Sequence, residues 1–139
     1  MNRIFVDTSA WVAVTNSNDQ YHDKASTFYK IIFKEYQELL TSSLVVAETY
    51  ILLRLDCGPD AALGWWERVC SSLKVKVIYA DPAITGEAIK ILRKFYDQPF
   101  SLTDAVSFAL MKKMKVTDAF AFDVHFTIAG FIQLPEQAS

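Results

Sequence analysis

Short apolar runs alternate along this chain with longer stretches in which apolar residues recur at helical spacing. Runs rich in β-branched and aromatic residues predict four short strands, at residues 3–6, 75–80, 118–122 and 131–134. Helical periodicity, together with caps and breakers, predicts helices after Thr8–Ser9 and over residues 20–40, 44–55, 60–69, 81–95 and 101–114. This alternation predicts an α/β fold with one domain over residues 1–139. Its central parallel sheet should have about four or five short strands, covered by helices on both faces.

Composition narrows the classes of protein to which the chain can belong. Its 139 residues are 52% hydrophobic and 22% charged, which excludes a disordered tail and fits one ordinary domain. The formal net charge of −2 excludes a protein that holds nucleic acid by bulk charge alone. No apolar run reaches the roughly 18 residues of a membrane helix, and the N-terminus lacks a signal-peptide pattern. We therefore expect a cytoplasmic protein without a membrane partner, with Cys57 and Cys70 as buried free thiols.

Most of the acidic residues lie where a solvated helix face would place them, but four do not. Asp7 and Asp123 directly follow predicted strands, at the sheet edge where parallel sheets bind ligands. Glu48 lies in a helix that is apolar almost all round and is therefore expected to be buried. Asp104 is the fourth residue of a helix start at Ser101.

Each of these acids also has a purely structural interpretation. Asp7 and Asp123 can be helix caps or turn residues after a strand. Glu48 can form an ion pair with Arg54, and Asp104 can complete a capping box with Ser101.

Taken together, the four acids favour a metal site. Converging carboxylates repel one another at neutral pH unless a positive partner holds them. A hard divalent cation with oxygen ligands, Mg²⁺ or Mn²⁺, is the natural partner. Such a cation can orient a phosphodiester, activate a water molecule and stabilise the leaving oxygen.

The chain resembles the PIN-domain family, in particular the small bacterial PIN ribonucleases that act as toxins in toxin–antitoxin pairs. The similarity extends over nearly the whole chain in the right order. The matching segments are residues 6–11, 41–48, 101–109, 119–126 and Gly130–Phe131.

The resemblance implies a single PIN-like domain and a Mg²⁺- or Mn²⁺-dependent endoribonuclease. It implies an RNA substrate, a cognate antitoxin protein and a homodimer. The acidic quartet that would bind the metal and carry catalysis is Asp7, Glu48, Asp104 and Asp123.

The resemblance also suggests supporting residues and marks two departures. Thr8 or Ser9 would orient Asp7, and Thr103 would support Asp104. Many relatives have a hydroxyl residue two positions before the fourth acid, where this chain has Ala121. A fifth acid after the fourth is also missing, and His125 stands two positions on.

His125 and two groups of basic residues leave their roles open. His125 can contact substrate phosphate or assist proton transfer near the site, or it can simply pack at a helix start beside Phe126. The lysines of residues 112–115 either complement a helix dipole or contact RNA, and the basic residues of 90–94 pose the same choice.

Three functions compete at this stage. The first is the metal-dependent PIN ribonuclease, and the second is a non-catalytic PIN module that binds RNA or protein. The third is another α/β phosphohydrolase or phosphotransfer fold, such as a haloacid-dehalogenase-like phosphatase or a receiver domain. The former would need a second acid at Ser9, and the latter would need an acidic pair after the first strand and a phosphoacceptor on a middle strand.

Overall fold

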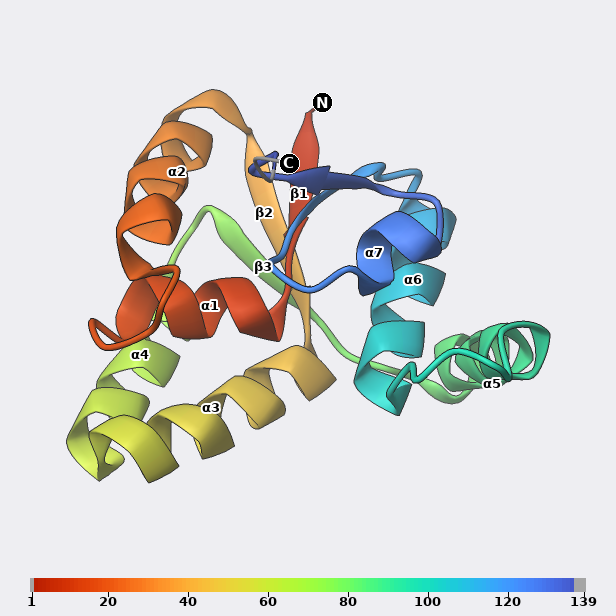
Figure 1. Ribbon diagram of the computed structural model, residues 1–139, viewed down its shortest axis with the longest axis horizontal. Helices are drawn as coiled ribbons and strands as arrows, with labels where there is room; N and C mark the ends of the chain where they lie inside the picture. Colours follow the sequence, from red (N-terminus) through yellow and green to blue (C-terminus); the bar gives the residue numbers. More distant parts are fainter. Residues whose placement is uncertain (1, 137–139) are drawn as a thin grey trace.

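Five short parallel strands form one sheet in the computed structural model, which describes residues 2–136 (Figure 1). The strand order is β3-β2-β1-β4-β5, and every neighbouring pair is parallel. The strand bounds are β1 Arg3–Val6, β2 Glu38–Ser42, β3 Val75–Ile78, β4 Asp118–Phe120 and β5 Ile132–Leu134.

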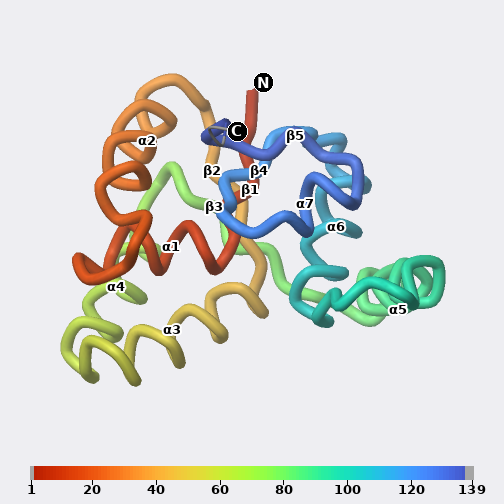
Figure 2. The backbone as a smooth tube through the Cα atoms, in the orientation of Figure 1, coloured from red at the N-terminus to blue at the C-terminus, as the bar shows by residue number. Residues whose placement is uncertain are grey.

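Seven helices in the described chain connect these strands and cover the sheet. In Figure 1 the sheet stands between α1 and α2 on the left and α6 and α7 on the right, and Figure 2 follows the same path as a tube. The α3 helix packs against α1 and α4, and α5 packs against α6. The helix bounds are α1 Thr8–Thr15, α2 His22–Glu35, α3 Ser43–Cys57, α4 Pro59–Ser71, α5 Pro82–Lys94, α6 Leu102–Met114 and α7 His125–Ile128. The expected doubly covered parallel sheet is confirmed.

The core lies on both sides of β1, which is the central strand. Ile4, Phe5 and Val6 are fully buried, as a strand covered on both faces requires. The ring of Phe126 from α7 packs against Phe5 and perpendicular to Phe108 of α6, with centroids 6.2 and 5.0 Å apart. This aromatic contact fixes α6 and α7 against the strand that carries Asp7 at its end.

The helix expected over residues 20–40 is wrong in its last five residues. The α2 helix ends at Glu35, and residues 38–42 form β2 between β1 and β3. Leu39 and Leu40 continue the helical spacing of α2, but their burial comes from pairing with both neighbouring strands. Tertiary pairing overrides a local helical pattern here.

Two burial expectations also fail. The α3 helix buries only one face, because Ile51, Leu52 and Leu55 are exposed. Cys57 and Cys70 are free, as expected, but exposed rather than buried. None of the helices between residues 2 and 136 is long and apolar enough to cross a membrane.

Substitution of Leu40 tests the assignment of β2. We expect Leu40→Ala to lower the free energy of unfolding by ~2–5 kcal/mol, because a buried leucine leaves a cavity. Leu73→Ala is the matched control, since Leu73 is 94% exposed and should change stability by less than about 0.5 kcal/mol. Urea unfolding of both variants measures the difference. Equal stabilities would contradict the buried strand.

Candidate active site

The order of the strands reverses beside β1, and two of the candidate acids lie there. From β1 the chain builds β2 and β3 on one side, then returns to place β4 and β5 on the other. In open parallel sheets, ligands bind beyond the carboxyl ends of the strands at this switch point. Asp7 follows β1 directly, and Asp123 follows β4 after two residues. The fold therefore puts both acids at the place where such sheets bind ligands.

Ser9 fixes the direction of the Asp7 side chain. The Ser9 hydroxyl donates to Asp7 Oδ2 at 2.8 Å, and the Ser9 N–H reaches the same oxygen at 3.3 Å. The Ser9 oxygen also accepts a hydrogen bond from the Phe122 N–H at 3.0 Å. Ser9 therefore links the segment after β1 to the segment after β4. Asp7 is the N-cap of α1. The observed cap therefore lies one residue before the cap expected at Thr8–Ser9.

Asp104 is held at the first turn of α6. Its Oδ2 accepts from the Ser101 N–H at 3.0 Å, while the Ser101 hydroxyl accepts from the Asp104 N–H at 3.0 Å. This is the expected capping box. Thr103 makes no side-chain hydrogen bond to Asp104 in the described chain, and its carbonyl accepts from the Ser107 hydroxyl.

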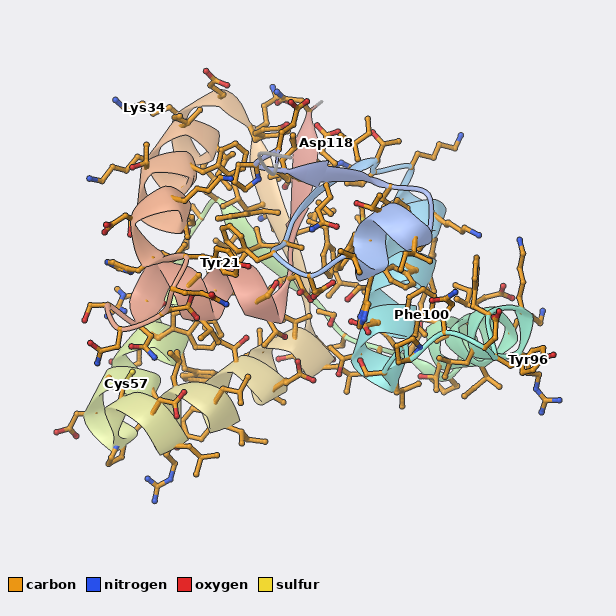
Figure 3. The ribbon with its side chains drawn as sticks, in the orientation of Figure 1. Tyr21, Lys34, Cys57, Tyr96, Phe100 and Asp118 are labelled. Carbon is orange, nitrogen blue, oxygen red and sulfur yellow. The ribbon has the colours of Figure 1, made fainter. Side chains whose placement is uncertain are left out.

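His125 joins Asp104 to Asp123, which sequence reasoning did not foresee. Because a carboxylate accepts hydrogen bonds, His125 Nδ1–H donates to Asp104 Oδ2, at 2.8 Å. The same Nδ1 lies 3.8 Å from Asp123 Oδ1, and that oxygen accepts from the His125 N–H at 2.9 Å. The imidazole packs edge-on against the ring of Phe100, with ring centroids 5.4 Å apart. Figure 3 labels Phe100 near the place where α5 and α6 meet. The sequence signal for this contact was the position of His125, two residues after Asp123.

The electrostatics of Asp7 show that three acids converge. The pKa of Asp7 is raised from its ordinary 3.8 to about 8, mainly by burial, with the charges of Asp123 and Asp104 adding to the rise and the hydrogen bonds from Ser9 opposing it. Asp7 is 3% exposed and Asp104 is 8% exposed. Neighbouring carboxylates repel one another when they are ionised, and a cation is needed to compensate their charge. The structure thus brings Asp7, Asp104 and Asp123 together.

Glu48 stands apart from this arrangement. It is half-buried on α3, the helix that follows β2, and forms no ion pair with Arg54 or any other described residue. Among residues 2–136, no group of three or more His, Cys, Asp and Glu side chains is arranged closely enough to hold a metal ion. The quartet is therefore incomplete as the side chains stand.

The donor set nevertheless suits a divalent cation. One oxygen on each of Asp7, Asp104 and Asp123 takes part in the hydrogen bonds described above, and the other has no partner in the described chain. Free carboxylate oxygens are the ligands that Mg²⁺ and Mn²⁺ prefer. Burial is the largest cause of the raised pKa of Asp7, and the charges of Asp123 and Asp104, which add to it, are charges that a cation would offset. The residues therefore fit a divalent cation in the kind of ligand atom that they supply.

Comparison with known proteins identifies the class of the chain. Residues 4–132 match the PIN domain family. A curated relative from Mycobacterium tuberculosis, the 23S rRNA-specific endonuclease VapC20, is 34% identical over 132 residues, covering 94% of this chain and 97% of that protein. The chain belongs to the PIN domain family, which removes the phosphatase and receiver alternatives.

Solved structures agree with this family. The crystal structure of M. tuberculosis VapC20, described as a sarcin-ricin loop cleaving toxin, matches with a TM-score of 0.86 and 33% identity, over 93% of this chain and 96% of that one. VapBC2 of Rickettsia felis, bound to a promoter DNA fragment, matches with a TM-score of 0.69 and 14% identity, over 94% and 96% of the two chains. The second match shows a shared fold.

The raised pKa of Asp7 predicts how stability depends on pH without metal. The folded protein keeps a proton on Asp7 up to about pH 8, whereas the unfolded chain loses it near pH 3.8. This contribution to stability is therefore complete below pH 3.8 and is lost as the pH rises toward 8. In EDTA, we expect Asp7→Asn to flatten the fall of Tm between pH 5 and 8. At pH 8 it should melt roughly 5 °C or more above wild type.

Thermal melts of wild type and Asp7→Asn across this pH range provide the measurement. Asn keeps an oxygen that can accept from Ser9, so the cap is preserved. Parallel curves of Tm against pH would refute the buried, protonated Asp7. Saturating Mg²⁺ should stabilise wild type more than Asp7→Asn, because a cation binds the ionised carboxylate.

Proposed function

We propose that this chain is a metal-dependent endoribonuclease that hydrolyses RNA phosphodiester bonds and acts as the toxin of a toxin–antitoxin pair in the cytoplasm. The observation that carries this function is the convergence of Asp7, Asp104 and Asp123 at the switch point of the sheet. The relative that is 34% identical over most of the chain is named a 23S rRNA-specific endonuclease. RNA of the ribosome is accordingly the substrate class to test first.

The metal would be Mg²⁺ or Mn²⁺, held by Asp7, Asp104 and Asp123, with Glu48 as the fourth acid. When bound, it supplies positive charge that orients the phosphodiester and favours attack by water. The protein's own contribution is to preorganise the carboxylates. Ser9 holds Asp7, and His125 with the Ser101 N–H holds Asp104, so that the free oxygens keep a fixed direction.

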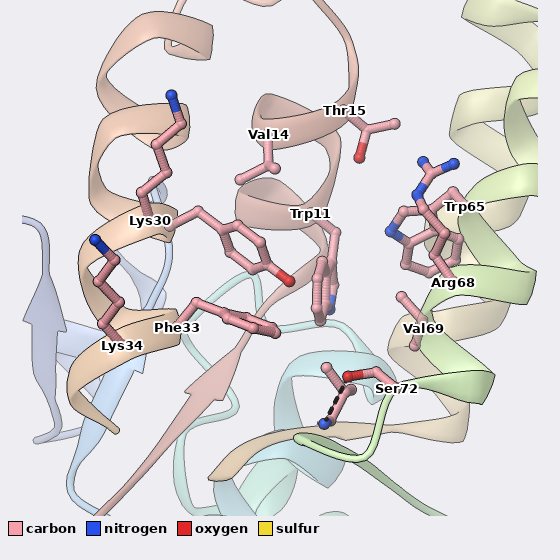
Figure 4. Close-up of a pocket in the computed structure, with 12 residues that line it drawn as sticks. Trp11, Val14, Thr15, Lys30, Phe33, Lys34, Trp65, Arg68, Val69 and Ser72 are labelled. Carbon is pink, nitrogen blue, oxygen red and sulfur yellow. Dashed lines mark hydrogen bonds between the residues drawn. The ribbon is translucent and has the colours of Figure 1, made fainter. Parts of the chain in front are cut away.

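The antitoxin would dock in a groove between α1, α2 and α4. This groove of about 640 Å³ is walled by Trp11 and Trp65, and Figure 4 shows Lys30 and Lys34 on one rim and Arg68 on the other. Apolar walls with a basic rim suit an apolar segment that carries acidic residues.

A second copy of the chain would cover a different surface, the apolar patch between α3, α4 and β3. It includes Ile51, Leu63, Trp66 and Tyr79, all exposed, and the residues lining its cavity of about 560 Å³ include no charged side chain. A two-fold dimer brings one patch against itself. A neutral apolar patch can do this, whereas the basic rim of the α1–α2–α4 groove would repel its own copy. We therefore assign the homodimer to this patch.

Asp104→Asn separates metal ligation from helix capping. Asparagine keeps the capping geometry but removes a charge from the acidic site, so cleavage of 23S rRNA with Mg²⁺ or Mn²⁺ should fall by at least about 100-fold. In EDTA its Tm should equal or exceed that of wild type, because one repelling carboxylate is gone. Asp81→Asn is the matched control, since Asp81 caps α5 through the Ile84 N–H at 2.8 Å and lies outside the acidic site.

Gel assays of RNA cleavage and thermal melts provide the two measurements. The Asp81→Asn protein should cleave like wild type. An Asp104→Asn protein that also cleaves like wild type would remove Asp104 from the site. A wild-type protein that binds RNA but never cuts it, with either metal, would favour the non-catalytic PIN module instead.

The dimer assignment predicts a charge-sensitive interface. Wild type should sediment as a dimer at micromolar concentration, and Trp66→Glu should sediment as a monomer, because it buries an unpaired charge in an apolar contact. Leu73→Glu is the control, since Leu73 is exposed and does not line the patch. Monomeric wild type would contradict the homodimer, and a dimeric Trp66→Glu would contradict this interface.

A further inference from the structure

The groove between α5 and α6 gathers lysines from both helices. It has a volume of about 570 Å³, and its lining includes Lys90 and Lys94 of α5 and Lys112 and Lys113 of α6. Glu87 is the one acid in this lining, and it is paired with Lys90 through Nζ and Oε1 at 3.0 Å. Four lysines against one acid make this a basic surface on a chain whose formal net charge is −2.

The contacts within the protein do not account for this gathering of charge. Lys112 and Lys113 lie in the last turn of α6, where cations complement the helix dipole, but they form no ion pair in the described chain. Lys94 lies over the ring of the adjacent Phe95, 5.5 Å from its centroid. Like charges around one groove repel one another, so an anion that enters it would be bound favourably.

We propose that this α5–α6 lysine groove binds phosphate groups of the RNA backbone outside the cleavage point. The inference rests on the proposed ribonuclease function and adds a second contact for the same substrate. The floor of the groove is apolar, formed by side chains such as Ile84, Ile91 and Ala109, so it offers flexible ammonium groups above a surface without base-reading amides. Ammonium groups of this kind contact phosphates without reading sequence.

The position of the groove relative to the acids suits an RNA that is larger than a short oligonucleotide. Asp104 lies in the first turn of α6, and Lys112 lies eight residues further along the same helix. At 1.5 Å per residue, this separation is about 12 Å along the helix axis. A folded RNA whose scissile phosphate lies at the acids therefore has further phosphates within reach of the groove, while a short oligonucleotide does not need it. The groove would raise affinity for structured RNA without taking part in hydrolysis.

The test removes charge from the groove and, in a matched variant, from elsewhere. Lys112→Gln/Lys113→Gln neutralises two groove lysines, and Lys24→Gln/Lys76→Gln neutralises two exposed lysines on α2 and β3 that do not line it. All four side chains are exposed, so both proteins should fold, which a thermal melt checks. Binding of 23S rRNA is measured in EDTA, where no cleavage occurs, across a series of salt concentrations.

We expect the groove variant to bind the rRNA at least about threefold more weakly at ~0.1 M salt. Its plot of log K against log salt should be shallower by about 1–2, as the loss of one or two phosphate contacts requires. With metal, the KM for rRNA should rise while kcat on a short oligoribonucleotide stays at the wild-type value. The control variant should match wild type in each assay.

Other outcomes overturn the inference and separate it from the proposed function. Unchanged rRNA binding and salt slope in the groove variant would refute the groove, whatever the protein cleaves. Loss of binding to a poly-glutamate peptide without any loss of RNA binding would assign the groove to an acidic protein instead. A wild-type protein that cuts no RNA would refute the ribonuclease function, and the binding series in EDTA would still decide the groove.

Discussion

The hydroxyl of Ser9 is the contact on which the site depends. It donates to Asp7 and accepts from the N–H of Phe122, so it joins the chain after β1 to the chain after β4. Those two strands are neighbours, but strand pairing alone does not direct a side chain beyond the end of a strand. The Ser9 hydroxyl therefore fixes the direction of the Asp7 carboxylate relative to the two paired strands. Because Ser9 also supplies this link, the hydroxyl missing at Ala121 is not needed to tie the two segments together.

The acidic residues of the site lower the stability of the fold that holds them. Burial and two neighbouring acids raise the pKa of Asp7, which shows that ionised carboxylates are unfavourable there without a cation. The aromatic contacts of Phe126 with Phe5 and Phe108 lie behind the site and hold α6 and α7 against β1. Apolar packing thus keeps together groups whose charges repel. Among residues 2–136, His125 is the one side chain that forms an ion-pair contact with these carboxylates, so the site can accept a cation.

The sequence was sufficient for what depends on local pattern and insufficient for what depends on packing. Acids directly after apolar runs marked Asp7 and Asp123, and the box at Ser101 marked Asp104. The strand β2 was missed because Leu39 and Leu40 continue the helical spacing of α2. The contact of His125 with Asp104 joins residues 21 positions apart and exists only because α7 packs beside α6. No periodicity in the sequence encodes that distance.

The formal net charge of −2 conceals four surfaces of different character: the acidic site, the basic-rimmed α1–α2–α4 groove, the apolar α3–α4 patch and the α5–α6 lysine groove. At physiological salt, exposed charges are screened beyond roughly 8 Å. Each surface therefore acts on a partner through its own charges rather than through the total. This is why a weakly acidic chain can be proposed to bind RNA at one surface, an acidic peptide at another and its own copy at a third. Bulk charge excludes binding by long-range attraction, and it leaves binding by local contacts open.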